Sequence, residues 1–583
     1  MKMIQFKYAI ISTAFLLGGM TTGCDTLDID NLETYDESMV WGDLNLAQAY
    51  VNNLYEECFE GWSVSADQNS DQVTGIPWYL GTITETGDSY KKWDYTKIRH
   101  INEAIFKLES SVIEDKDAVD FMLGQAYFMR AYMYYWMVLH HGGVPYLKVP
   151  QDKDKDDLYV KRNSTPECFQ FMIEDLDHAI SLLPAKIAGS SSDYGRIDQC
   201  FAKSWKAKTL LLKASPQFNP KRMYDNAYWK EAYVAAKEAY DFCVQNGIAL
   251  TENPADIWLQ EKGPEVIFPV IYSNPNRVAT WEYGTRPASV SRDKPYHNPT
   301  WEFVKDFPML DGKRYDDPTG KYYVGDEQAL LKAFWKNRDP RFNRACLYNG
   351  REWPVAGRPA DNRMYNALGV SNADDQYGVN PNAGVNAANN DIFSGMYNYK
   401  VSDLSLTQDK VMTFDIDYIL MRFAEVMFIY AEAANENGHS DVAIDLLKQI
   451  RKRAGINETS SNPEMKGKVY GLNPNMNQTE MREAVREERF IELLFEQKRL
   501  WDMRRWMIYD NLMNGQGKRH ALVMNKQADN TYTTYLFDRD NTPMITNQNI
   551  YFLPMKRSEM SNNPNLEQTK GWENGTFDPQ AGL

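Results

Sequence analysis

Four side chains near residue 490 have the types and the spacing to do acid–base or metal chemistry. Glu488, Glu492 and Glu496 recur at every fourth position and Arg499 follows, so one long helix would place all four on one face. Carboxylates grouped in this way can exchange protons or bind a cation. The same spacing also produces ion pairs with basic neighbours such as Arg489, and a structural ion-pair network is the interpretation that we favour.

An acidic cluster in the first third of the chain resembles part of a calcium-binding loop. It comprises Asp152, Asp154, Asp156 and Asp157. Such a loop carries glycine at its sixth position and an acid at its twelfth, whereas this chain has Asp157 and Asn163 there. We therefore expect a solvated acidic loop and no metal site.

The adjacent imidazoles of His140 and His141 could suggest catalysis, but they precede a Gly-Gly-Val-Pro turn and are expected to end a helix. No HExxH, P-loop, GxSxG or GxGxxG motif occurs in the sequence. No motif therefore nominates a catalytic residue or a cofactor, and we predict neither.

The N-terminus is typical of a bacterial export signal. Lys2 and Lys7 precede an apolar run over residues 8–17, and small residues connect this run to Cys24. The run is too short to span a bilayer. We therefore predict that residues 1–23 are removed from the mature protein.

Cys24 resembles the lipobox cysteine of bacterial lipoproteins, although Thr21 stands where leucine is more usual. Acyl chains on this thiol would hold a soluble domain on a membrane without a spanning helix. We predict a lipid anchor at Cys24 and a linker over residues 24–40. The alternative is an ordinary secretory signal that is cleaved elsewhere.

Composition argues against a nucleic-acid partner. The chain has 64 basic and 80 acidic residues, and loss of Lys2 and Lys7 changes the formal net charge from -16 to -18. Binding to phosphate backbones needs clustered Lys and Arg.

The remaining cysteines form no CxxC pair, so we expect buried thiols and neither a zinc site nor a disulfide framework; they are Cys58, Cys168, Cys200, Cys243 and Cys346.

Helical periodicity dominates two blocks, over about residues 43–245 and 416–510. Leu123, Gly124, Tyr127 and Ala131 match the core of a tetratricopeptide helix, but no strict 34-residue period follows. We predict degenerate tetratricopeptide-like helix pairs in a mainly α protein. The expected helices cover residues 95–108, 119–139, 166–183, 200–214 and 228–244 in the first block, and 418–435 and 441–454 in the second.

A further long helix is expected to begin near Thr479, whose hydroxyl can cap it, and to continue toward residue 510. Between the blocks, residues 248–413 are rich in Pro, Gly, Asn and aromatic residues and are expected to form loops and short elements. Long loops on a rigid scaffold often carry function. We treat residues 41–583 as one domain that ends in the segment 511–583.

Several short motifs follow one another in order along the chain: Trp93-Asp94-Tyr95, Gly142-Gly143-Val144-Pro145, Asn298-Pro299-Thr300, Phe307-Pro308-Met309-Leu310-Asp311-Gly312, Arg338-Asp339-Pro340-Arg341-Phe342, Tyr430-Ala431-Glu432-Ala433, Arg499-Leu500-Trp501-Asp502 and Tyr551-Phe552-Leu553-Pro554. In these motifs the chain resembles the SusD/RagB family, the surface glycan-binding lipoproteins of Bacteroidetes. The resemblance covers nearly its whole length.

The resemblance implies a helical scaffold with a loop-rich ligand-binding portion packed on it. It also implies a non-catalytic protein at the outer membrane that faces the cell exterior, captures glycan and delivers it to a SusC-like TonB-dependent barrel. Acids that follow the lipid cysteine serve as a surface-export signal in this family, and Asp25, Asp28 and Asp30 match that pattern.

A glycan site needs exposed flat aromatic rings that stack on the C–H faces of sugars, with polar groups for the hydroxyls. By positional analogy with the family we expect the platform in loops outside clear helices. The predicted ligand-binding residues are Trp78, Tyr79, Trp281, Tyr283, Asp67, Asn69 and Arg286. The helical tryptophans are expected in the core; they are Trp93, Trp136, Trp501 and Trp506.

Two other functions remain open. A glycoside hydrolase would need two carboxylates at a defined separation across a cleft, and 80 acids leave that arrangement possible. A third hypothesis is capture of another nutrient, such as a peptide, on the same architecture. The identity of the glycan depends on loop conformations that a sequence does not specify.

Overall fold

The structure is a computed structural model of the 583-residue chain. It describes residues 37–74, 83–87, 92–287, 290–291, 297–357, 394–456, 469–510, 520–526, 529, 532–538 and 548–583. The predicted signal over residues 1–23 and the anchor at Cys24 lie outside the described residues.

The fold is mainly helical, as predicted. The helices of the first block are α1 (Glu37–Gly42), α2 (Leu44–Cys58), α4 (Tyr95–Glu109), α5 (Lys116–His141), α6 (Thr165–Leu182), α7 (Gln199–Ala214) and α8 (Tyr228–Gln245). Those of the second block are α14 (Phe423–Glu436), α15 (Ser440–Ala454), α16 (Gln478–Glu492) and α17 (Arg499–Arg505). Short helices elsewhere are η1 (Ala66–Asn69), α9 (Asp256–Leu259), α10 (Trp281–Thr285), α11 (Trp301–Asp306), α12 (Glu327–Leu331), α13 (Pro340–Ala345), η4 (Gln408–Thr413), η5 (Gln548–Tyr551) and α19 (Arg557–Asn562).

Strands are short and, within the described residues, form four two-stranded antiparallel sheets. The pairs are β1 (Val73–Thr74) with β3 (Asn298–Pro299), β2 (Val266–Val270) with β6 (Tyr418–Arg422), β4 (Cys346–Tyr348) with β5 (Met396–Asn398), and β7 (His520–Lys526) with β8 (Tyr532–Asp538). The β2–β6 pair connects the loop-rich region to the second helical block.

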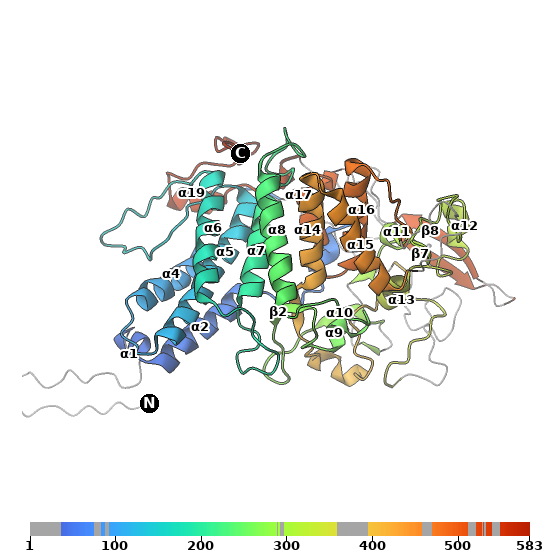
Figure 1. Ribbon diagram of the computed structural model, residues 1–583, viewed down its shortest axis with the longest axis horizontal. Helices are drawn as coiled ribbons and strands as arrows, with labels where there is room; N and C mark the ends of the chain where they lie inside the picture. The colour runs from blue at the N-terminus through green and yellow to red at the C-terminus, as the bar shows by residue number, and fades with distance from the viewer. Residues whose placement is uncertain are drawn as a thin grey trace, which may run out of the picture.

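The two helical blocks form one continuous scaffold. Helices α5, α6, α7 and α8 stand side by side, and α14 packs against α8, so that the second block extends the row (Figure 1). Tyr240 of α8 lies between the two blocks, with its ring centroid 5.3 Å from that of Phe423 and 5.4 Å from that of Tyr430. Side chains of both blocks belong to one hydrophobic core.

Two expectations about the second block are wrong. Residues 418–422 form strand β6 instead of the first turn of a helix, because they pair with β2. The expected long helix after residue 479 is divided into α16 and α17, with left-handed φ angles of 56° at Phe495 and 60° at Gln497 between them. Local periodicity does not reveal either interruption.

The carboxylates of Glu488 and Glu492 form structural ion pairs, which is the interpretation that we favoured from the sequence. Glu488 lies 2.7 Å from Arg341, and Glu492 lies 2.9 Å from Arg422 and 3.0 Å from Arg341. All of these side chains are buried. Since each carboxylate is held by guanidinium groups of other elements, the row connects the loop-rich region to α16.

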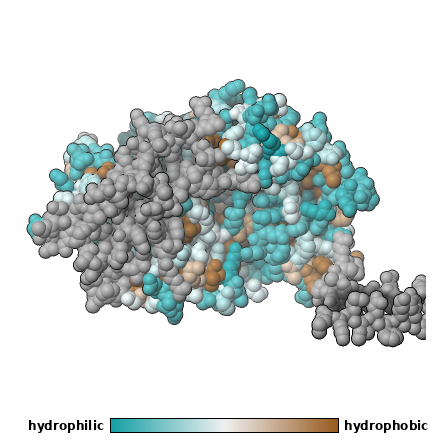
Figure 2. Space-filling view, turned by 180° about the vertical axis from the view of Figure 1, so that it is seen from behind, coloured by the Kyte–Doolittle hydropathy of each residue, from teal (hydrophilic) through white to brown (hydrophobic). Residues whose placement is uncertain are grey.

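The surface in Figure 2 is mainly hydrophilic, with hydrophobic residues in small separate patches among the coloured residues. Within the described residues no helix is long and apolar enough to cross a membrane, and no cluster of His, Cys, Asp or Glu could hold a metal ion. Asp154, Asp156 and Asp157 of the acidic cluster are exposed and Asp152 is half-buried. The five cysteines of the described chain are buried free thiols, as expected.

Candidate functional site

Two of the four predicted aromatic residues, Trp281 and Tyr283, are among the described residues. Trp78 and Tyr79 lie outside the described residues, so their role stays a prediction. Trp281 is only 1% exposed, its indole Nε1 donates to the carbonyl of Val401 at 3.1 Å, and its ring lies 4.6 Å from that of Trp62. The expectation that Trp281 presents an open face is therefore wrong, because the ring packs in the core.

The predicted polar partners are interior as well. The carboxylate of Asp67 faces His297 Nε2 at 3.2 Å, and the backbone carbonyl of Asn69 accepts from Tyr509. Arg286 is 2% exposed, pairs with Glu282 and donates to the carbonyl of Leu406 at 2.6 Å.

These side chains join loops to one another instead of facing solvent. Tyr283 is half-buried, and its carbonyl accepts from Ser291 at 2.7 Å. Among the predicted aromatic residues that the structure describes, Tyr283 is therefore the one with a partly accessible ring.

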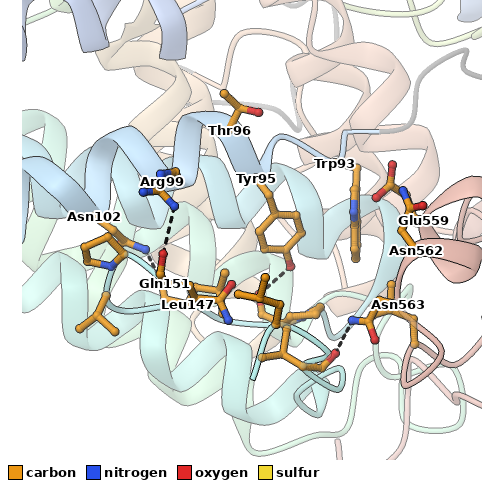
Figure 3. Close-up of a pocket in the computed structure, with 16 residues that line it drawn as sticks. Trp93, Tyr95, Thr96, Arg99, Asn102, Leu147, Gln151, Glu559, Asn562 and Asn563 are labelled. Atoms are coloured by element: carbon orange, nitrogen blue, oxygen red, sulfur yellow. Dashed lines mark hydrogen bonds between the residues drawn. The ribbon is translucent and has the colours of Figure 1, made fainter. Parts of the chain in front are cut away.

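An open cavity on the helical scaffold combines aromatic rings with polar side chains. We call it the α4 shelf; it has a volume of about 430 Å³. The start of α4, the loop between α5 and α6, and α19 contribute its walls (Figure 3). It is lined by Trp93, Tyr95, Thr96, Arg99, Asn102, Pro145, Leu147, Val149, Pro150, Gln151, Leu158, Val160, Glu559, Asn562, Asn563 and Leu566.

Two aromatic rings form one wall of the shelf. The rings of Trp93 and Tyr95 are 4.9 Å apart at 67°, and a second edge contact places Trp93 5.6 Å from His141. Trp93 is half-buried, so part of its indole remains open to the cavity. Tyr95 donates to the carbonyl of Pro145 at 2.6 Å, and burial raises the pKa of its phenol well above the ordinary value. The phenol is therefore a neutral, fixed part of the wall.

Several polar side chains hold the floor of the shelf. Asn102 Nδ2 donates to the carbonyl of Leu147 at 2.9 Å, and Arg99 Nη1 donates to that of Gln151 at 3.0 Å. From the opposite side, Asn563 Nδ2 donates to the carbonyl of Val160 at 2.8 Å. These bonds, drawn in Figure 3, fix the loop between α5 and α6 against α4 and against the end of α19.

Other polar groups on the shelf remain available. The side chains of Thr96, Glu559 and Asn562 make no hydrogen bond or ion pair with the described residues. Glu559 and Asn562 lie beside the Trp93 ring (Figure 3). An aromatic face flanked by an amide and a carboxylate can stack on an apolar ring face while it bonds to hydroxyl groups. The geometry therefore suits a polyhydroxylated ligand with flat apolar faces.

A second cavity, of about 440 Å³, lies between α5, α7 and the residues after α16. Trp136 and Trp501, which we expected in the core, are half-buried and line it, whereas Trp506 is a core residue as predicted. Trp205 Nε1 and His140 Nε2 also belong to this cavity, and both lack a hydrogen-bond partner among the described residues. Both atoms are buried, and the charged side chains of Lys92, Asp94, Lys97, Lys208 and Lys498 also line the cavity.

Sequence reasoning missed the shelf because Trp93 belongs to a helical motif. The signal that could have located it is its position just before the first residue of α4, where a side chain is less enclosed than within a helix. Its partners Glu559 and Asn562 are more than 460 positions away in the chain. No local pattern connects them.

The fold and the shelf together define a mainly helical protein whose scaffold carries an open, aromatic-walled site. A family model described as "SusD family" matches residues 264–572, more than half of the chain. A second model, described as "Starch-binding associating with outer membrane", matches residues 43–194. The chain therefore belongs to the SusD family.

Two curated relatives come from Formosa agariphila. SusD-like protein P2 is 23% identical over 81% of this chain and 79% of its own length, and SusD-like protein P38 is 25% identical over 86% and 92%. A solved SusD-like protein from Bacteroides fragilis has a TM-score of 0.73 at 21% identity, covering 93% of this chain and 99% of that one. A laminarin-binding SusD-like protein has a TM-score of 0.58 at 17% identity, covering 91% and 99%. These structures share the fold.

Proposed function

We propose that this protein binds glycan at the cell surface without catalysis and delivers it to a SusC-like TonB-dependent barrel in the outer membrane. The observation that carries the proposal is the open Trp93 face beside the unengaged side chains of Glu559 and Asn562. Sugar rings have apolar C–H faces edged by hydroxyls, so this arrangement matches their surface.

The relatives support the class of ligand. One structural neighbour from Bacteroides fragilis is described as a SusD-like carbohydrate binding protein, and another neighbour as laminarin binding. The description of the family model that matches residues 43–194 supports association with the outer membrane. The transporter partner follows from the family resemblance alone.

Affinity electrophoresis against a panel of neutral and acidic polysaccharides tests the proposal. We expect at least one polysaccharide to retard the wild-type protein and Trp93→Ala to weaken that binding by about tenfold or more. Loss of a buried aromatic contact costs about 1.5–3 kcal/mol, and 1.4 kcal/mol corresponds to a factor of ten.

Tyr323→Ala is the matched control, because Tyr323 is 52% exposed and does not line the shelf. Trp78→Ala tests the remaining sequence prediction in parallel. If Trp93→Ala and Tyr323→Ala bind equally well while Trp78→Ala does not bind, the ligand site lies at the predicted loop and the assignment of the shelf is wrong.

A glycoside hydrolase is the competing function. Among the described residues that line the shelf, Glu559 is the only acid, whereas the usual mechanisms use two. Release of reducing ends from the polysaccharide panel measures this activity. Turnover that Glu559→Gln abolishes would replace the binding proposal with an enzymatic one.

A further inference from the structure

A third cavity lies between the loop-rich region and the buried ion-pair network, and basic side chains outnumber acidic ones in its wall. It has a volume of about 490 Å³. Five basic and two acidic side chains are among the residues that line it: Arg341, Arg344, Arg351, Lys400, Arg422, Asp403 and Glu492. The excess of positive charge contrasts with the acidic composition of the whole chain.

Three of the five cations are neutralised by the network. Arg341 Nη2 lies 2.7 Å from Asp339, and Arg422 Nη1 lies 2.6 Å from Glu265. Lys400 pairs with Glu496 and donates to the carbonyl of Leu494 at 2.8 Å. These side chains are held in place, and their charge is compensated.

Arg344 and Arg351 differ from them, because neither guanidinium has a carboxylate within 4 Å in the described residues. Arg344 donates to the carbonyl of Ala454 at 3.4 Å. Arg351 donates to the carbonyl of Cys346 and stacks 4.2 Å above the ring of Tyr399, which also lines the cavity. Both side chains are half-buried, and burial lowers the pKa of both guanidinium groups.

The acids of the wall are already engaged. Glu492 is shared between Arg341, Arg422 and Arg453. The carboxylate of Asp403 accepts from the backbone N–H of Ser405 at 3.0 Å and from its hydroxyl at 2.7 Å. Neither acid forms an ion pair with Arg344 or Arg351.

We infer that this cavity is an anion site, in which Arg344 and Arg351 bind a carboxylate or sulfate group of a ligand. A planar guanidinium offers paired N–H donors that match the oxygens of either group. The Tyr399 ring holds the guanidinium of Arg351 in a fixed plane, and Ser402 and Ser405 add hydroxyl groups to the wall. Trp93 takes no part in this site, so the inference is independent of the α4 shelf.

Isothermal titration calorimetry at constant ionic strength tests the inference with three probes: sodium sulfate, trigalacturonate and neutral maltotriose. We expect sulfate, trigalacturonate or both to bind to the wild-type protein. Arg344→Gln and Arg351→Gln should each weaken that binding by about tenfold, because one hydrogen bond to a charged group contributes about 1.5–3 kcal/mol. The anionic probe that binds more tightly identifies the ligand group as sulfate or carboxylate.

Arg222→Gln is the matched control, since the Arg222 side chain is 65% exposed and lies outside the cavity. Maltotriose binding should be equal in all variants. Absence of binding by both anions, or unchanged anion binding in the double variant Arg344→Gln/Arg351→Gln, would overturn the inference.

A measurement on the wild-type protein avoids dependence on the folding of variants. Phenylglyoxal modifies accessible guanidinium groups, and peptide mass spectrometry reports the extent of modification at each arginine. Sulfate or trigalacturonate should protect Arg344 and Arg351 but not Arg222. Equal protection of all three, or of none, contradicts a specific anion site.

Discussion

Single buried side chains determine how this fold responds to pH. Glu488, Glu496 and Asp502 have pKa values lowered by neighbouring basic groups that outweigh the opposing effect of burial, so their stabilising effect is lost as the pH falls. Asp417 behaves in the opposite way. Its pKa is raised to about 7, first of all by burial and also by Glu261 and Asp415, while the N–H of Tyr272 and Lys262 act against the rise.

We predict that Asp417→Asn makes the protein more stable at pH 8. A raised folded-state pKa means that the folded protein binds more protons than the unfolded chain between about pH 4 and 7, so stability falls as the pH rises through that window. The gain at pH 8 is up to about 4 kcal/mol, since each pKa unit corresponds to about 1.4 kcal/mol. The amide oxygen still accepts the 2.7 Å hydrogen bond from Tyr272.

Urea denaturation at pH 4, 6 and 8 measures the effect. The difference between variant and wild type should be near zero at pH 4 and grow toward pH 8. Asp154→Asn is the control, because Asp154 is exposed and is not among the groups that shift the pKa of Asp417. A difference that does not depend on pH would show that Asp417 has an ordinary pKa.

At the scale of elements, the start of α16 shows how local chemistry defines a helix. The sequence suggested Thr479 as the cap, whereas Asn477 holds that position in the structure. Its Oδ1 accepts from the N–H groups of Thr479 at 2.9 Å and Glu480 at 3.0 Å, and Glu480 Oε2 accepts from the Asn477 N–H at 2.9 Å. This is a capping box with asparagine at the cap.

Asn477→Ala should lower the free energy of unfolding by about 1 kcal/mol, because two N–H groups lose their acceptor. Thr479→Ala is the matched comparison, and we expect it to change stability by less than about 0.5 kcal/mol, as for most surface substitutions. Chemical denaturation of both variants measures the two effects. A larger loss for Thr479→Ala would show that the helix starts at the position suggested by the sequence.

At the scale of the whole molecule, anchoring and binding are separate properties. The shelf lies on the helical scaffold, whereas the predicted lipid anchor is at Cys24, outside the described residues. Cys24→Ala should therefore release the protein from the membrane without changing its affinity for glycan. Surface labelling of intact cells and affinity electrophoresis of the purified variant measure the two properties. Unchanged labelling of cells that produce Cys24→Ala would exclude the lipid anchor.

Local periodicity predicted the helical scaffold, and the motifs along the chain predicted the family. Helices α4 to α8 and α15 begin and end within about three residues of the predicted positions. Amphipathic periodicity and turn signals are properties of neighbouring residues, so a sequence displays them directly. Ion pairs were predicted for Glu488 and Glu492, but their partners Arg341 and Arg422 come from other elements. The suggested neighbour Arg489 pairs with Asp502 instead.

The sequence did not predict which aromatic rings are accessible. Trp281 lies in the loop-rich region and is buried against Trp62, whereas Trp93 lies at the start of a helix and faces the shelf. The exposure of a ring depends on which distant segments pack on it. For Trp93 these include α19, which joins the shelf from the far end of the chain and brings Glu559 and Asn562 beside the indole.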